Sequence, residues 1–326
     1  MRISIALASY NGERFIAEQL ASFLRQTRLP DEVVISDDGS TDRTLEIVEA
    51  FRKSAPFDVK VIRAEGNQGF VANFNRALEG TSGDLVFLSD QDDVWFANKL
   101  AMVEAKAHSE ADAFVLMSDA ALTDEHLMDV GVTKLAQIRG SGLPLTRFAM
   151  GCCAAIRREF LDLVMPIPGD FESHDVWLVK IADGIGRKCV IDDVLQYYRR
   201  HGNNISSGLT SALTPLTRFN YYKRHIERLV GGESEAGCSG SDQVRYISIL
   251  REGVLRASGN ARGDLADELK RFADRLDAMR GTLERRLYVR SRPRLLRIVE
   301  VMRLWRAGDY NAFSGGKSAV RDLMFK

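Results

Sequence analysis

The stretch GDLVFLSDQDDVW, residues 83–95, joins an apolar run to a cluster of carboxylates. The apolar residues Leu85 to Leu88 predict a buried strand over residues 84–90. Asp90, Asp92 and Asp93 follow within four positions. Because like charges at a strand end repel one another, this cluster indicates a site for a bound cation. The alternative is that one aspartate caps the next helix and the others are solvated.

Short apolar runs alternate with helix-period segments through the first half of the chain. Strands are predicted at residues 3–9, 32–38, 58–64, 84–90 and 112–120. Segments between them, such as ERFIAEQLASFLRQT, repeat apolar residues at helical spacing. The alternation predicts an α/β fold with a mostly parallel central sheet flanked by helices on both faces.

The charge distribution divides the chain into two regions. The 326 residues carry no net charge, but residues 1–210 have 22 Lys and Arg against 31 Asp and Glu, and residues 211–326 have 23 against 14. We predict a catalytic domain at 1–210 and a basic helical region at 211–326. With four Cys in no metal-binding spacing, and no long apolar segment at the N-terminus or elsewhere, we expect a cytoplasmic protein without a structural metal.

Polar loops follow the first four predicted strands. They contain SYNGE, DDGSTD, EGNQGF and SDQDD in chain order. Ligands of open α/β sheets bind beyond the carboxyl ends of the strands, so these loops predict one binding site. No GxGxxG follows the first strand, and SGGKS (314–318) lacks the first Gly of a P-loop because residue 311 is Asn. A diphosphate would therefore need another cation, and clustered aspartates favour Mg²⁺ or Mn²⁺.

These motifs, in this order and spacing, resemble family 2 glycosyltransferases with a GT-A fold. The resemblance covers roughly residues 2–210 and rests on ALASYNGERF, ISDDGSTD, GNQGF and LSDQDDVW. Within the family the chain is most similar to bacterial rhamnosyltransferase-like enzymes of surface polysaccharide (O-antigen or capsule) synthesis. The resemblance implies transfer of a sugar, L-rhamnose among the candidates, from a dTDP- or UDP-sugar to a saccharide or polyprenyl-linked acceptor.

The resemblance also implies roles on the donor side. The expected nucleotide-binding residues are Ser9, Tyr10, Glu13, Asp38, Asn67, Gly69 and Asp92. Of the acidic cluster, Asp92 would contact the ribose and Asp93 would bind Mn²⁺ or Mg²⁺, with Asp90 in support. His201, after the last core strand, would bind the metal or the diphosphate.

An inverting transfer needs a carboxylate that deprotonates the acceptor hydroxyl. In ESHDVWL (172–178), Asp175 matches the family's base, and His174 replaces the acidic residue usual beside it. His174 would orient Asp175 or contact the acceptor; the alternative role for Asp175 is to cap the following helix. Arg199 or Arg200 would neutralise phosphate, and Gly151, within MGCCAAI, would line the acceptor side.

An arginine-rich segment marks the basic region. Between Arg285 and Arg306 lie eight arginines and one acid, interleaved with apolar residues that include Trp305. This pattern predicts either a helix on the inner face of the membrane or a helical bundle that packs on the catalytic domain or a second subunit. We do not expect nucleic-acid binding.

Three functions remain open at this point. The first is a metal-dependent, inverting glycosyltransferase. The second is a sugar-1-phosphate nucleotidyltransferase, although the loop SYNGERF lacks the Gly-rich, basic sequence usual after the first strand of those enzymes. The third is a protein that binds nucleotide-sugars without catalysis.

Overall fold

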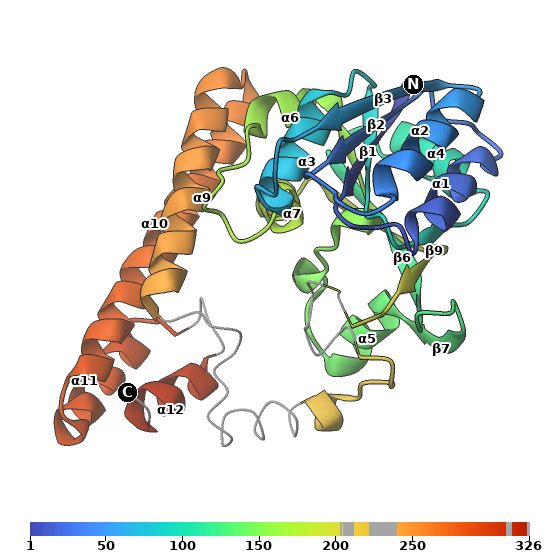
Figure 1. The fold of residues 1–326 in the computed structure, drawn as a ribbon. Helices are drawn as coiled ribbons and strands as arrows, with labels where there is room; N and C mark the ends of the chain where they lie inside the picture. Colours follow the sequence, from blue (N-terminus) through green and yellow to red (C-terminus); the bar gives the residue numbers. More distant parts are fainter. Residues whose placement is uncertain (203, 205–211, 222–239, 311–314, 325–326) are drawn as a thin grey trace. The chain divides into compact units, whose positions relative to one another are not determined.

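A computed structural model describes residues 1–202, 204, 212–221, 240–310 and 315–324 (Figure 1). The chain divides into two compact units, Met1–Gly232 and Glu233–Lys326. The domain boundary predicted between residues 210 and 211 lies at the edge of a stretch outside the described residues.

The first unit is built on a nine-stranded sheet. Its strands are β1 (Ile3–Ser9), β2 (Glu32–Asp37), β3 (Asp58–Arg63), β4 (Leu85–Ser89), β5 (Val94–Trp95), β6 (Val115–Thr123), β7 (Asp129–Thr133), β8 (Ala154–Arg157) and β9 (Lys188–Arg199). Their order is β3-β2-β1-β4-β8-β6-β9-β5, and β7 pairs with β6. The first four predicted strands are confirmed, and the fifth begins three residues later than expected.

The sheet is mixed, so the expectation of a mostly parallel sheet holds only for its first half. β3, β2, β1 and β4 are all parallel neighbours. β8 then lies antiparallel between β4 and β6, and β5 pairs antiparallel with β9. Only β6 and β9 restore a parallel pair. The polar loops after β1, β2 and β4 therefore meet at one edge, as parallel strands require.

The described helices of the first unit pack on the faces of the sheet. They are α1 (Ile16–Leu24), α2 (Thr44–Ser54), α3 (Phe70–Glu79), α4 (Lys99–Ser109), α5 (Lys134–Ser141), α6 (Arg158–Val164) and α7 (His174–Gly184), with short 3₁₀ turns at Leu145–Arg147 and Gly151–Cys153. Ile3, Ile5 and Leu7 alternate along β1 and pack in one buried cluster with side chains of α1, α2 and α4. On the opposite face, α3 contacts β1 and β2. Burial of both faces explains why these strands read as continuous apolar runs.

The second unit is helical, as predicted. It contains α9 (Gly240–Asn260), α10 (Asp264–Ser291), α11 (Arg294–Arg306) and α12 (Gly316–Met324). A small core of Val289, Val301, Leu304, Tyr310 and Ala319 joins α10, α11 and α12. Within the described residues, every helix is too short or too polar to reach across a bilayer.

Candidate active site

Asp38, just after β2, is fixed by three donors. It is 2% exposed. One carboxylate oxygen accepts the backbone N–H groups of Gln68 (3.0 Å) and Gly69 (2.8 Å), and the other accepts Arg76 Nη2 (2.5 Å). The loop after β2 is thereby joined to the turn that begins α3. Gly69 suits that turn because its φ of 91° is unfavourable for other residues.

The loops after β1, β2 and β4 are also joined to one another. Tyr10 N–H donates to Gln91 Oε1 (2.9 Å), and Gln91 Nε2 donates back to Tyr10 O (3.0 Å). Asn11 N–H donates to Ser40 Oγ (2.8 Å). Tyr10 itself is 41% exposed. The four polar loops found in the sequence are therefore one continuous surface in the structure.

The remaining predicted nucleotide-binding residues differ in accessibility. Ser9 is buried, and its hydroxyl donates to Asp37 Oδ2 (3.0 Å). Glu13 is exposed and accepts the backbone N–H of Arg43 (3.0 Å). Asn67 is exposed and accepts the N–H of Gly69 (3.1 Å). Tyr10, Glu13 and Asn67 can be reached from solvent, whereas Ser9 supports the loop from below.

The three aspartates of the acidic loop occupy different environments. Asp93 is fully buried, and its oxygens accept Gln196 Nε2 (2.9 Å) and the N–H of Arg199 (3.2 Å). The Asp92 side chain is 14% exposed, and its Oδ2 lies 2.8 Å from His201 Nε2. Asp92 and His201, which lie 109 positions apart in sequence, therefore form a pair at the edge of the sheet.

Mutual repulsion and burial shift the ionisation of this loop. Burial, with the charges of Asp92, Asp93 and Asp175, raises the pKa of Asp90 well above its ordinary range. Burial and the charge of Asp92 raise the pKa of Asp93 to about 7. Geometry also links the predicted base to this loop, because Asp175 accepts the N–H of Gly151, and the next residue, Cys152, has its thiol within 4.8 Å of carboxylate oxygens of Asp90 and Asp93.

A buried lysine that the sequence analysis missed lies beneath the acidic loop. Lys99, the first residue of α4, is 1% exposed, and burial lowers its pKa to about 8. Its ammonium group donates to Cys152 O (2.8 Å) and to Gln196 Oε1, and it lies 3.9 Å from the centre of the Trp95 ring. Gln196 in turn donates to Asp93. Lys99 thus connects the acidic loop, β9 and the 3₁₀ turn that contains Gly151.

Asp175 lies in the first turn of α7, where several donors hold its carboxylate. Gly151 N–H donates to Asp175 Oδ2 (3.1 Å), and Val176 N–H (2.7 Å) and the Ser173 hydroxyl donate to Oδ1. The side chain is partly exposed. Its own helix and the Gly151 turn therefore orient one carboxylate toward the acidic loop.

His174 is buried beside Asp175, and neither ring nitrogen has a hydrogen-bond partner among the residues that the structure describes. It is 7% exposed, and its ring stacks on Phe74 with centroids 3.6 Å apart. Burial lowers its pKa to about 4 against the weaker opposing charge of Asp175. Its Nε2 lies against Gly151: a Cβ atom at that position would be 2.7 Å from it. A neutral imidazole is thus packed behind the predicted base.

Arg199 is engaged by protein groups on all sides. It donates to Asp92 O (2.8 Å), to Glu125 O (2.9 Å) and to the Glu18 carboxylate. Its guanidinium group also lies over the Phe15 ring. Arg200 is partly exposed and contacts Tyr198. Of the two arginines expected to neutralise phosphate, Arg199 is therefore bonded to protein groups, whereas Arg200 is the more accessible.

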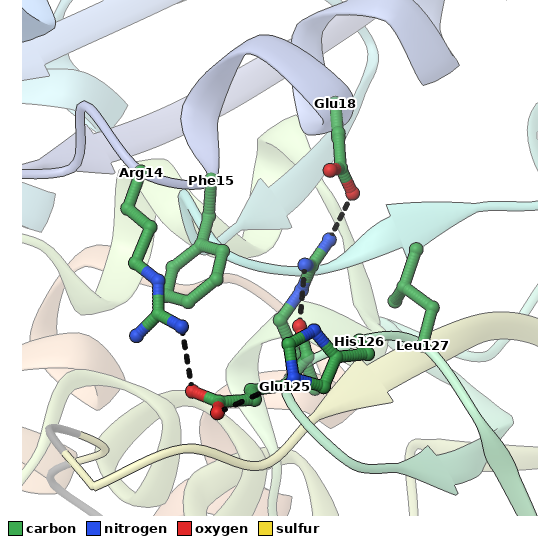
Figure 2. Close-up of a pocket in the computed structure, with 7 residues that line it drawn as sticks. Arg14, Phe15, Glu18, Glu125, His126 and Leu127 are labelled. Carbon is green, nitrogen blue, oxygen red and sulfur yellow. Dashed lines mark hydrogen bonds and ion pairs between the residues drawn. The ribbon is translucent and has the colours of Figure 1, made fainter.

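An open pocket of about 290 Å³ lies beside Arg199 (Figure 2). Its lining residues are Arg14, Phe15, Glu18, Glu125, His126, Leu127 and Arg199. Arg14 and Glu125 face each other and form an ion pair of 2.7 Å (Figure 2). The Phe15 ring also contacts the His201 ring, with centroids 4.7 Å apart. The pocket therefore adjoins the Asp92–His201 pair.

The acidic loop fits a hard divalent cation. Mg²⁺ and Mn²⁺ prefer oxygen ligands, and a cation would relieve the repulsion that raises the pKa of Asp90. Ligand atoms of Asp90, Asp93 and Cys152 lie within 4.8 Å of one another. Burial raises the pKa of the Cys152 thiol, which keeps it protonated and a poor ligand. The carboxylates, with His201, are thus the donors suited to a metal.

Comparison with known proteins now places this arrangement in a family. Residues 4–164 match the model of glycosyl transferase family 2. The chain is 31% identical over 229 residues to the uncharacterized glycosyltransferase alr2836 of Nostoc sp., an alignment that covers 65% of this chain and 69% of that protein. The chain belongs to glycosyl transferase family 2. This family 2 enzyme is therefore a glycosyltransferase, which decides among the three functions left open by the sequence.

Two further relatives show how far the similarity extends. The glycosyltransferase is 38% identical over 98 residues to the dTDP-rhamnosyl transferase RfbG of Shigella flexneri. That alignment covers 29% of this chain and 34% of RfbG. A crystal structure of residues 1–349 of Staphylococcus aureus TarS in complex with UDP superposes with a TM-score of 0.52 at 21% identity, over 87% of this chain and 90% of that one. The structural match supports the GT-A fold.

Proposed function

We propose that this glycosyltransferase is an inverting, metal-dependent enzyme of bacterial surface polysaccharide synthesis. Its donor would be a dTDP- or UDP-sugar, L-rhamnose among the candidates, and its acceptor a saccharide or polyprenyl-linked saccharide. The similarity to RfbG, a dTDP-rhamnosyl transferase, supports this donor class. The complex of TarS with UDP supports a pyrimidine nucleotide.

The observation that carries the proposal is the approach of Asp175 to the acidic loop. Asp175 is held by the N–H of Gly151, and the adjacent Cys152 lies with its thiol within 4.8 Å of carboxylate oxygens of Asp90 and Asp93. One carboxylate at the acceptor side and a carboxylate cluster at the donor side are what a single displacement requires. Asp175 would take the proton of the acceptor hydroxyl as its oxygen attacks the anomeric carbon, and the nucleoside diphosphate would leave.

We assign the metal to Asp92 and His201 in preference to Asp93. Both oxygens of Asp93 already accept protein hydrogen bonds, and its side chain is fully buried. The Asp92 side chain, paired with His201, is more accessible than Asp93, at 14% exposed. A bound Mg²⁺ or Mn²⁺ would stabilise the departing diphosphate. Asp93 would keep the loop in place, and Tyr10, Glu13 and Asn67 would contact the nucleoside from the accessible side.

Donor binding and transfer can be tested separately. Thermal shifts with UDP- and dTDP-sugars, each with Mn²⁺ or Mg²⁺, identify the donor; a donor at about 100 times its Kd adds roughly 2.7 kcal/mol of stability. Asp175→Asn should then bind that donor as the wild type does but lose transfer by at least about a thousandfold. Asp162→Asn, an exposed carboxylate on α6, is the matched control. Near-normal turnover by Asp175→Asn would remove the base assignment.

A further inference from the structure

Helix α11 has an outward face of large apolar side chains. Leu295, Ile298, Val299, Met302 and Trp305 recur every three or four residues and are 84%, 54%, 70%, 50% and 49% exposed. α12 also exposes two apolar side chains one turn apart, Val320 at 58% and Met324 at 59%. Monomeric proteins rarely leave a continuous apolar helix face uncovered, so this face indicates a binding surface.

The inward face of the same helix is packed. Arg297, Val301 and Leu304 are 1%, 3% and 7% exposed. Arg297 donates to the backbone carbonyls of Arg292 and Arg290, which fixes the start of α11 to the end of α10. The outward stripe is therefore held in a defined orientation by the core of the second unit.

The arginines of this segment have two different roles. Arg286 and Arg290 bind the buried carboxylate of Asp322, and Arg285 binds Asp309. These three stabilise the helical unit. Two others, Arg303 and Arg306, are exposed on α11 itself. Three of the eight arginines therefore serve ion pairs within the helical unit, whereas Arg303 and Arg306 remain exposed on the helix that carries the apolar stripe.

The charged side chains nearest the centre of the stripe are arginines. At 3.6 residues per turn, Arg306 falls within the stripe and Arg303 at its edge, whereas Glu300 lies roughly 160° around the helix from Met302. Trp305 lies at the end of the stripe, next to the exposed arginines. Apolar side chains bordered by arginine and tryptophan are the pattern of a helix that lies in the plane of a bilayer surface.

We propose that α11 docks flat on an anionic lipid surface. Leu295, Val299 and Met302 would enter the boundary between headgroups and acyl chains, and Arg303 and Arg306 would bind lipid phosphates. A negatively charged bilayer matches both the apolar area and the charge, whereas a second copy of this face would bring like charges together. The docking surface does not depend on the proposed reaction.

Tryptophan fluorescence reports this surface directly. Of the three tryptophans, Trp95 and Trp177 are 2% and 0% exposed and Trp305 is 49% exposed. With the full-length protein, vesicles of phosphatidylcholine and phosphatidylglycerol should shift the Trp305 emission to the blue, and brominated lipids should quench it. Pure phosphatidylcholine vesicles should have much less effect, and added salt should reverse the binding because it screens the arginines.

Two pairs of substitutions separate the apolar and charged contributions. Arg303→Gln with Arg306→Gln should weaken partitioning onto anionic vesicles about 25-fold, since each arginine contributes about fivefold. Val299→Ser with Met302→Ser should weaken it at least about tenfold. The matched control is Leu255→Ser with Arg262→Gln, exposed positions outside α11, which should bind as the wild type does. Asp175→Asn should also bind vesicles normally, which distinguishes this proposal from the catalytic one.

Two outcomes would overturn the proposal. The first is an unchanged Trp305 emission, with no co-sedimentation on anionic vesicles at low salt. The second is a blue shift that appears with increasing protein concentration in the absence of lipid and disappears in the Val299→Ser, Met302→Ser protein. That result would show that a second copy of the chain covers the stripe.

Discussion

His174 should make the protein lose stability in mild acid. The residue is 7% exposed, its ring nitrogens have no hydrogen-bond partner within the described part of the chain, and burial lowers its pKa from 6.5 to about 4. At neutral pH it is uncharged in both the folded and the unfolded chain. As the pH falls below 6.5, the unfolded chain binds the proton first, so the free energy of unfolding decreases until the pH reaches about 4.

The size of the effect follows from the two pKa values. A difference from 6.5 to about 4 corresponds to roughly 3 kcal/mol once the pH is below both values. At about pH 4.5 most of it, some 2 to 3 kcal/mol, should already be lost. This is a large part of the 5–15 kcal/mol typical of a folded domain, so the effect should be measurable.

Urea unfolding at about pH 7 and about pH 4.5 tests this prediction. The wild type should lose roughly 2 to 3 kcal/mol more than His174→Leu between the two conditions. Leu keeps a similar volume beside Phe74 but cannot take up a proton. Burial raises the pKa of Asp90 and Asp93, which acts in the opposite direction, but this contribution is common to both proteins.

The comparison needs an exposed histidine as its control. His108→Gln on α4 should follow the wild type at both pH values, because its side chain is exposed. Equal pH dependence of the wild type and His174→Leu would refute the argument. It would mean that the imidazole finds a partner or takes up a proton without cost in the folded protein.

Three further substitutions probe the groups around the proposed base and metal. Lys99→Met leaves the acceptors Cys152 O and Gln196 Oε1 without the Lys99 ammonium group as donor. Each acceptor left without it costs about 1–3 kcal/mol, and removal of a buried charge offsets part of this cost, so urea unfolding should show a loss of about 2 kcal/mol. Unchanged stability would contradict this prediction. Gly151→Ala would place a Cβ 2.7 Å from His174 Nε2, so kcat should fall while calorimetry finds the donor Kd unchanged; a normal kcat would show that the ring can move. In His201→Gln, the gain in donor affinity that Mn²⁺ provides should be smaller by about tenfold or more. If donor titrations with and without Mn²⁺ give the same affinities as the wild type, His201 is not a metal ligand.

The first half of the fold could be predicted because its strands carry a strong signal. β1, β2 and β4 are buried on both faces, so each is a continuous apolar run that ends abruptly in polar residues. The second half carries a weaker signal. β8 has four residues and follows a 3₁₀ turn, and nothing in AAIR shows that it will lie antiparallel between β4 and β6. Its direction depends on pairing with strands distant in sequence.

The buried charges of the site escaped prediction for a related reason. Lys99 occupies the first position of a helix whose sequence resembles any amphipathic helix, and its acceptors lie 53 and 97 positions away. Arg199 or Arg200 was expected to neutralise phosphate because their segment resembles a family motif. The side chain of Arg199 also binds Glu18, 181 positions earlier. Spacing along the chain identifies which residue types gather at an edge, but not which of them is satisfied by a distant partner.

The unfavourable groups of the first unit gather at the edge where we place the reaction. The imidazole of His174 finds no hydrogen bond from any described residue, Lys99 is a buried cation, and Asp90 and Asp93 repel each other within a few ångströms. Each is costly on its own, and each is held by the rigid sheet through Gly151, Gln196 or Arg199. A bound cation would offset the repulsion among the carboxylates, and a bound donor would supply the negative charge opposite that cation. Donor and metal should therefore stabilise the protein together by more than the sum of their separate effects, and a purely additive pair of thermal shifts would argue against a shared site.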